Sequence, residues 1–275
     1  MTGDFTYFVV LAGMRTGSNL LEECLTAMPG LRSHGELFNP HFFGKPDRTK
    51  QFGLSLEARD ENPLKVIEAM RDGGDGLPGF RLFNDHDRRV IDHVLEDRSA
   101  AKIILTRRPI DSYVSLQIAR KTGQWWLGDL ASARSAKVDF HTDDYVTFLN
   151  ALNDFQDKVR RTLQVTGQTA FQIDYGDLSD PEIINGLGRF LGARGPADMT
   201  KVRAKVQNPK PLADRLSNPV EAEAALTALG APDIGFIPSY EPDRGPGLRM
   251  FHVCRNAPLL YMPIRGAGRD PVPDW

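Results

Sequence analysis

The sequence predicts an α/β fold, a P-loop-like central parallel sheet flanked by helices and followed by an irregular C-terminal segment. Three observations support this class: apolar strands alternate with amphipathic helices, the first strand enters its helix through a glycine-rich turn, and no internal repeat is present. A chain of 275 residues, 41% hydrophobic, can bury one substantial core. We therefore expect a single domain, 1–275, with its core at about 5–218 and a C-terminal extension, 219–275, packed on it.

Apolar runs and helical periodicity place the individual elements. The predicted strands are Phe5 to Ala12, Gly79 to Asn84, Lys102 to Thr106 and Thr169 to Asp174. The predicted helices are Ser18 to Met28, a stretch around Arg88 to Leu95, one that begins with Pro109 in its first turn, and Asp143 to Val165. The segment 60–79 ends in RDGGDGLPG, which predicts an exposed loop.

The overall charge excludes one class of partner. With 34 basic and 36 acidic residues the net charge is −2, so no general field attracts nucleic acid or an anionic membrane, and any anion site must be local. The two cysteines, Cys24 and Cys254, fit no metal or redox spacing and are expected as reduced thiols. The apolar run from Phe8 to Ala12 is too short to span a bilayer and lacks the basic lead of a signal peptide. We expect a soluble, cytoplasmic protein without a transmembrane segment.

The turn after the first strand has the features of an anion-binding loop. Backbone N–H groups between Gly13 and Ser18 converge where the positive end of the helix dipole adds to them. Arg15 can donate to two oxygens of one anion. The residues expected to hold the anion are Arg15, Thr16, Gly17, Ser18 and Asn19. A solvated arginine in an ordinary strand-to-helix turn is the alternative.

A second basic segment follows the strand KIILT. A nucleoside triphosphatase would carry a magnesium-binding acid at such a strand end, whereas this strand ends in Arg107 and Arg108. Ser112 and Ser115 begin the next helix, where a hydroxyl and Arg107 can share one phosphate. Two phosphate sites at two strand ends predict a nucleotide phosphorylated at two places.

Together these motifs resemble the sulfotransferases that use 3'-phosphoadenosine 5'-phosphosulfate (PAPS). In that family the first loop holds the 5'-phosphosulfate, and an Arg and a Ser spaced like Arg107 and Ser115 hold the 3'-phosphate. The stretch FQIDYGDLSDPEIINGLGRFLG resembles another family segment, and SHGELFNP is similar to the bacterial trehalose and lipopolysaccharide sulfotransferase branch. The resemblance covers roughly residues 5–192. It implies PAPS as co-substrate and no required metal.

The chain departs from the family pattern in two ways. Arg15 stands where many members carry Lys, and no Arg-Lys-Gly segment is found to close over the 3'-phosphate. The possible substitutes for that segment are Lys201, Arg203, Lys205, Lys210 and Arg215, each of which is equally well explained as a solvated base.

The resemblance implies Glu36 as the general base, with Arg15 stabilising the leaving phosphate. His34 and His86 remain rivals because imidazole is the commonest base near neutral pH. Arg81 could contact the donor sulfonate, but we expect it instead as an exposed strand residue. The pair Trp125-Trp126 fits either a sugar platform or a packed interface.

Three functions follow from these patterns. The first is a PAPS-dependent sulfotransferase acting on a hydroxyl of a carbohydrate or glycolipid. The alternatives are a P-loop small-molecule kinase, which the missing Lys and the basic strand end disfavour, and a non-catalytic nucleotide or glycan-binding protein of the same fold. No nucleic-acid partner is expected, and the sequence leaves the oligomeric state open, homo-oligomers included.

Overall fold

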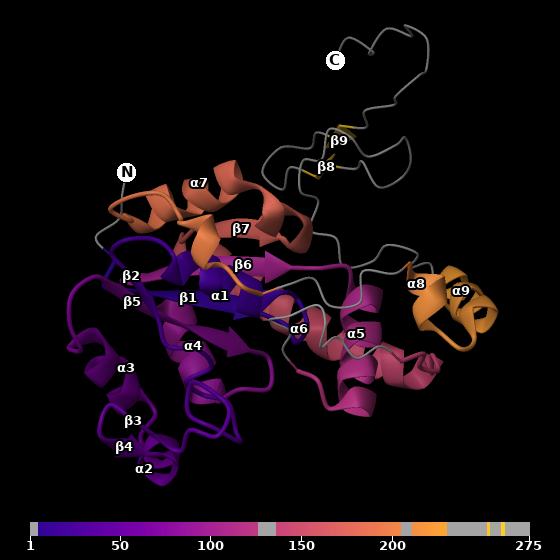
Figure 1. Cartoon of the computed structure of the whole chain (residues 1–275), viewed down its shortest axis with the longest axis horizontal. Helices are drawn as coiled ribbons and strands as arrows, with labels where there is room; N and C mark the ends of the chain where they lie inside the picture. Colours follow the sequence, from indigo (N-terminus) through magenta and orange to yellow (C-terminus); the bar gives the residue numbers. More distant parts are fainter. Residues whose placement is uncertain (1–4, 126–135, 205–210, 230–251, 254–259, 262–275) are drawn as a thin grey trace, which may run out of the picture.

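The central feature of the computed structural model is a parallel sheet of five strands in the order β2-β5-β1-β6-β7 (Figure 1). The structure describes residues 5–125, 136–204, 211–229, 252–253 and 260–261. The strands are β1 (Tyr7–Ala12), β2 (Leu31–Ser33), β5 (Leu77–Phe83), β6 (Ala100–Thr106) and β7 (Ala170–Asp174). The arrowheads of β1, β5 and β6 point the same way in Figure 1, so their carboxyl ends meet at one edge of the sheet.

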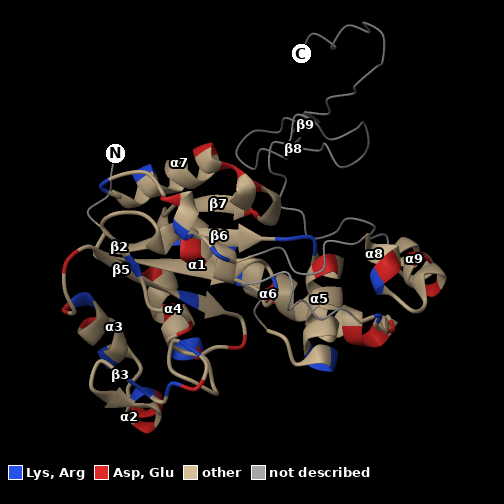
Figure 2. Ribbon diagram, in the orientation of Figure 1, with Lys and Arg blue, Asp and Glu red and all other residues tan. Residues whose placement is uncertain are grey.

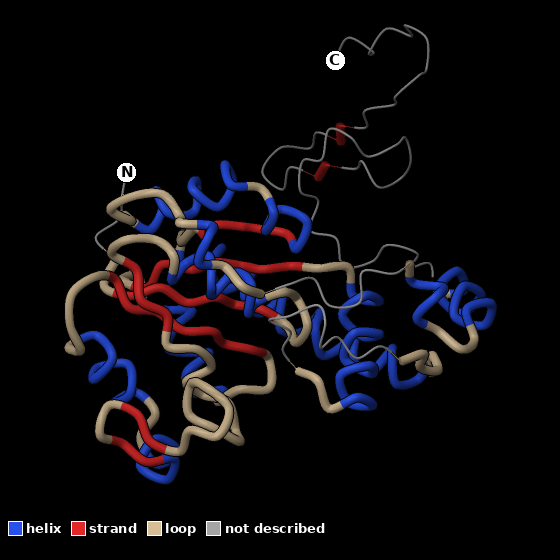
Figure 3. Tube along the Cα trace, in the orientation of Figure 1, coloured by secondary structure: helices blue, strands red, loops and turns tan. Residues whose placement is uncertain are grey.

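Helices connect and cover these strands (Figure 3). They are α1 (Ser18–Thr26), α2 (Leu56–Glu61), α3 (Leu64–Arg71), α4 (Arg88–Glu96), α5 (Pro109–Thr122), α6 (Thr142–Thr166), α7 (Pro181–Leu191), α8 (Leu212–Arg215) and α9 (Pro219–Ala228). Two short 3-10 turns are η2 (Tyr175–Ser179) and η3 (Met199–Lys201). Antiparallel pairs are formed by β3 (Lys50–Gln51) with β4 (Leu54–Ser55) and by β8 (His252–Val253) with β9 (Leu260–Tyr261).

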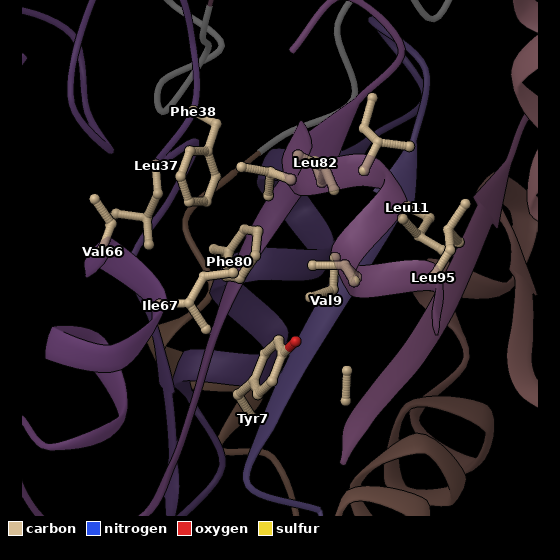
Figure 4. Close-up of a cluster of buried hydrophobic side chains, with 14 of the residues drawn as sticks. Tyr7, Val9, Leu11, Leu37, Phe38, Val66, Ile67, Phe80, Leu82 and Leu95 are labelled. Carbon is tan, nitrogen blue, oxygen red and sulfur yellow. The ribbon is translucent and has the colours of Figure 1, made fainter. Parts of the chain in front are cut away.

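Strand β1 is buried on both faces because alternate side chains enter two different cores. Tyr7, Val9 and Leu11 pack with apolar residues of α3, α4 and α6, and Figure 4 shows part of this cluster. Phe8 and Val10 pack with α1 and α7 on the opposite face. The continuous apolar run of β1 is therefore what a central parallel strand requires.

A third apolar cluster lies beside the sheet, where Figure 1 shows α5, α8 and α9. Ile110 and Tyr113 of α5 pack there against Tyr145 of α6, and Leu216 and Leu226 complete the cluster. Helix α5 begins at Pro109, directly after β6 ends at Thr106, so its N-terminus lies at the carboxyl end of β6 while its apolar side chains pack in this cluster.

The predicted fold class is confirmed, and each of the four predicted strands is present with boundaries shifted by a few residues. The segment 60–79 was predicted as a loop, and this is wrong in part, because Val66, Ile67 and Met70 give α3 an apolar face that packs on the sheet. Strand β2 was not predicted. Of the predicted extension 219–275, most residues lie outside the described ranges. Among the described residues, no helix combines the length and apolar character that crossing a membrane demands.

The order of the strands fixes where a ligand can bind. From β1 the chain continues through α1 to β2 on one side of the sheet, whereas from β6 it continues to β7 on the other side. Neighbouring loops that leave in opposite directions open a crevice at the carboxyl ends of the strands. The loops after β1 and β6 form this switch point, and they carry the two basic motifs of the sequence.

Candidate active site

The loop between β1 and α1 is a tight turn held by its own backbone. Arg15 and Gly17 both have positive φ angles, 64° and 94°, and the buried Thr16 hydroxyl donates to the Gly13 carbonyl at 2.8 Å. Within the described part of the chain no side chain caps the start of α1, and the first turn of α1 has no acidic residue. The N-terminal N–H groups of α1 therefore face the loop as an anion site requires.

Gly17 is needed because the loop lies directly on a tyrosine ring. A Cβ atom at Gly17 would come within 2.5 Å of Tyr175 and 3.0 Å of Leu178. Tyr175 follows β7, and the Arg107 guanidinium carbon lies 4.1 Å from the centre of its ring. Tyr175 thus supports both the first loop and the second basic motif.

Arg15 and Arg107 form one continuous cluster. Arg107 Nη1 donates to the Arg15 carbonyl at 2.8 Å, and Arg15 Nε donates to Ser115 Oγ at 3.1 Å. Arg15 Nη1 also donates to the Trp125 carbonyl at 2.7 Å. Burial and the nearby Arg107 charge lower the pKa of Arg15 to about 10, and burial lowers that of Arg107. Two partly desolvated cations side by side create a strong local attraction for an anion.

The two phosphate sites expected from the sequence are therefore contiguous, since Arg15 of the first motif contacts Ser115 of the second. Figure 2 shows the basic segment that leaves β6 at the carboxyl edge of the sheet. Ser112 Oγ is buried in the first turns of α5 and has no hydrogen-bond partner within the described part of the chain.

Of the five basic residues considered as substitutes for the missing segment, Arg215 is buried against α5. Arg215 and Arg108 both pair with Asp111, Arg108 at 2.6 Å. Burial alone would raise the pKa of Asp111, but the two guanidinium groups lower it overall. Lys201 and Arg203 are exposed, and positions 205 and 210 lie outside the described residues.

A second cluster forms around Arg81 on the other side of the first loop. Arg81 is buried, so the expectation of an exposed strand residue is wrong. Its Nη1 atom donates to Ser18 Oγ at 3.1 Å and to Asn19 Oδ1 at 2.5 Å. It lies 3.2 Å from Glu36 Oε1, while Nε lies 2.8 Å from Glu22 Oε2. One cation thus joins two carboxylates to the first turn of α1.

One feature of the sequence indicates that Arg81 is buried and paired. The residue interrupts the apolar strand GFRLF, and a charge inside a buried strand needs a partner. Its partners come from α1 and from the loop after β2, far away in the sequence.

Glu36 is held as a carboxylate. Asn39 Nδ2 donates to Oε2 at 2.8 Å, and His86 Nε2 lies 3.8 Å from the same oxygen. Burial would raise the pKa of Glu36, but His86, Arg81 and Asn39 together lower it below its usual range. Glu36 is therefore ionised near neutral pH and can accept a proton.

The loop that carries Glu36 is rigid. Glu36 and Gly44 exchange backbone hydrogen bonds of 2.8 and 3.1 Å, and a Cβ at Gly35 would lie 2.0 Å from the Gly44 carbonyl oxygen. The buried Arg59 guanidinium donates to three carbonyl groups of this loop, those of Leu37, Asn39 and Phe42. These contacts set the position of the Glu36 backbone, whereas its carboxylate is placed by Arg81 and Asn39.

The two histidines differ in their surroundings. His34 lies against Phe52, and burial together with nearby cations lowers its pKa to about 4. His86 is buried, and its Nδ1 accepts a hydrogen bond from the Phe83 N–H at 3.3 Å. Trp125 is 51% exposed, whereas position 126 lies outside the described residues.

Clusters of His, Cys, Asp and Glu side chains are what a bound metal ion requires. Within the described ranges, no group of three or more of these residues could hold a metal ion.

One match among known proteins agrees with the motifs. No profile of a known protein family matches the chain. Nodulation protein H of Rhizobium tropici is 27% identical over 219 residues, which cover 78% of this chain and 86% of that protein. A crystal structure of a sulfotransferase from Alicyclobacillus acidocaldarius is 19% identical, with a TM-score of 0.43 over 81% of this chain and 94% of the other. The match with Nodulation protein H, a sulfotransferase, runs through most of both chains and supports a sulfotransferase family and a sulfotransferase activity for this chain.

Proposed function

We propose that this sulfotransferase moves a sulfuryl group from PAPS to a hydroxyl of a carbohydrate or glycolipid. The observation that carries the proposal is the half-buried pair Arg15 and Arg107 at the switch point of the sheet, next to the N-termini of α1 and α5. Such a site attracts a ligand with more than one anionic group. The acceptor class is supported by the resemblance of SHGELFNP to bacterial carbohydrate sulfotransferases.

The donor would lie across the contiguous cluster. Its 5'-phosphosulfate would accept from the loop amides, that of Thr16 included, and from the side chains of Ser18 and Asn19, whereas the Thr16 hydroxyl is engaged by the Gly13 carbonyl. Because Ser18 Oγ and Asn19 Oδ1 already accept from Arg81, the Ser18 hydroxyl hydrogen and the Asn19 amide hydrogens point away from it and can donate. The 3'-phosphate would bind Arg107 and Ser115. Because Ser115 Oγ accepts from Arg15 Nε, its hydroxyl hydrogen is left to donate to a phosphate oxygen.

The reaction needs in-line displacement at sulfur. The acceptor oxygen forms a bond to sulfur as the sulfur–oxygen bond to the 5'-phosphate breaks, and adenosine 3',5'-bisphosphate leaves. Glu36 takes the proton from the acceptor hydroxyl. Arg15 and the loop amides stabilise the charge that grows on the departing phosphate oxygen. This assignment is supported by the ionised, rigidly held state of Glu36.

Thermal shift with two nucleotides tests the donor. Adenosine 3',5'-bisphosphate should raise the unfolding temperature, with a shift that grows with concentration, while ATP with magnesium should have a much smaller effect. Selective stabilisation by ATP and magnesium would instead favour a kinase, and no response to either nucleotide would favour a non-catalytic protein. Cytoplasmic location stays a prediction.

The acceptor requires a separate experiment. The protein should be incubated with radiolabelled PAPS and a panel of extracted glycans, glycolipids, tyrosine peptides and small alcohols. Label in the glycan or glycolipid fraction is expected, and label confined to peptides or alcohols would contradict the acceptor class.

A further inference from the structure

We infer that His86 is a positioning residue for Glu36 and acts through its Nε2–H group. The inference rests on the proposed function, in which Glu36 is the base. His86 is buried, and its Nε2 has no hydrogen-bond partner within the described part of the chain. A buried polar atom without a partner costs free energy, so its location calls for a role.

The hydrogen bond at the other ring nitrogen fixes the tautomer. The Phe83 N–H donates to His86 Nδ1 at 3.3 Å, and a nitrogen that accepts carries no hydrogen. The ring hydrogen therefore lies on Nε2, which faces Glu36 Oε2 at 3.8 Å. With Nδ1 engaged and Nε2 protonated, this ring has no free lone pair with which to take the acceptor's proton.

The charges around Glu36 explain what the His86 donor adds. Arg81 from β5 faces Oε1 but is shared with Glu22 of α1, so it does not neutralise Glu36 alone. Asn39 donates to Oε2, and His86 approaches the same oxygen from the loop after β5. The distance of 3.8 Å exceeds a hydrogen bond, and a small movement of Glu36 towards the ring on substrate binding would close it. His86 then fixes which carboxylate oxygen faces the acceptor.

Two substitutions separate the two ring nitrogens. His86→Gln reaches the Nε2 position with an amide donor but loses the Nδ1 acceptor. His86→Asn reaches the Nδ1 position, where its oxygen can accept from Phe83 N–H, but it leaves Glu36 without the donor. Turnover should fall by roughly tenfold or less in His86→Gln and by roughly a hundredfold in His86→Asn. The Kd for adenosine 3',5'-bisphosphate should stay within about twofold in both variants.

The pH profile provides a readout that a merely structural residue would not move. Without the Nε2 donor the Glu36 carboxylate is less stabilised, so the acid limb of kcat should move to higher pH in His86→Asn and little in His86→Gln. An equal loss in both variants with an unmoved acid limb would overturn the inference, and so would wild-type turnover in both.

A measurement on the wild-type protein covers the case in which these variants do not fold. Nitrogen-15 NMR of the histidine rings should identify His86 as the Nε2–H tautomer, with its Nε2 signal shifted by Glu36→Gln. A hydrogen on Nδ1 would overturn the inference. The proposed function fails separately: if Glu36→Gln keeps most of its turnover, Glu36 is not the base, whatever the tautomer of His86.

Discussion

Gly17→Ala should damage both stability and donor binding, and the structure allows the size of the effect to be estimated. The backbone at Gly17 has φ +94°, and an added Cβ would lie 2.5 Å from Cδ2 and 2.8 Å from Cε2 of Tyr175. A left-handed conformation costs an L-residue roughly 1–2 kcal/mol. Forcing a methyl group into packed surroundings costs about 1–3 kcal/mol more. The free energy of unfolding should therefore fall by ~2–5 kcal/mol in urea denaturation followed by circular dichroism.

Gly167→Ala is the matched control. Gly167 also has a positive φ, +66°, but nothing lies within 4 Å of its added Cβ, so only the backbone cost remains. The stiffening of the unfolded chain by alanine is common to both variants and cancels in the comparison. Calorimetric titration should also find that Gly17→Ala binds adenosine 3',5'-bisphosphate more weakly, whereas Gly167→Ala binds it normally. The reasoning is refuted if the two variants lose equal stability and bind the bisphosphate equally.

Three further predictions concern single side chains. Arg107→Ala should weaken bisphosphate binding by about 1.5–3 kcal/mol, and Ser115→Ala should weaken it by less. Arg160 is exposed, and Arg160→Ala should leave the affinity unchanged. If calorimetry finds that a folded Arg107→Ala protein binds the bisphosphate normally, Arg107 and Ser115 do not belong to the site. Glu36→Gln should lower turnover by roughly two to four orders of magnitude with little change in bisphosphate affinity, and a nearly normal kcat would contradict its role. The pKa of His34 is about 4 in the folded chain and near 6.5 in the unfolded chain, so the unfolded chain binds a proton more readily between these pH values. The free energy of unfolding should therefore fall by up to roughly 1.4 kcal/mol per pH unit as the pH falls from 6.5 to 4. His34→Gln should be less sensitive to acid in urea titrations at pH 7 and pH 5, and equal sensitivity would argue against this source.

The sequence predicted those parts of the fold that follow from local patterns. We could predict β1, β6 and the long amphipathic α6, because the spacing of their apolar residues is enough to distinguish strand from helix. Strand β2 has only three residues and follows a Pro-Gly turn, too short for a periodic pattern. Helix α3 was not predicted because the glycine-rich segment that follows it indicates a loop. Its apolar face is explained only by its packing against the sheet.

The site was predictable to the extent that its residues follow strand ends. The loop after β1 and Arg107 after β6 lie next to each other because adjacent parallel strands end at the same edge of the sheet. The burial of Arg81 was not predictable, because it depends on where Glu22 and Glu36 meet in space. The contact between Arg15 and Ser115 likewise joins residues 100 positions apart, which no spacing rule provides.

Strand β1 lies between β5 and β6 and separates two groups of site residues, which bears on how the site can evolve. Arg81, Glu36 and His86 lie on the β5 side of β1, whereas Arg107 and Ser115 lie on the β6 side. The chain that follows β1 contacts both groups, through Ser18 on the first side and Arg15 on the second. Under the proposed function, substitutions around Glu36 would alter the acceptor side of the site, which lies on the other side of β1 from Arg107 and Ser115. Because Arg81 contacts Glu36 as well as Ser18 and Asn19, acceptor choice and 5'-phosphosulfate binding would change together, while the 3'-phosphate contacts could stay as they are.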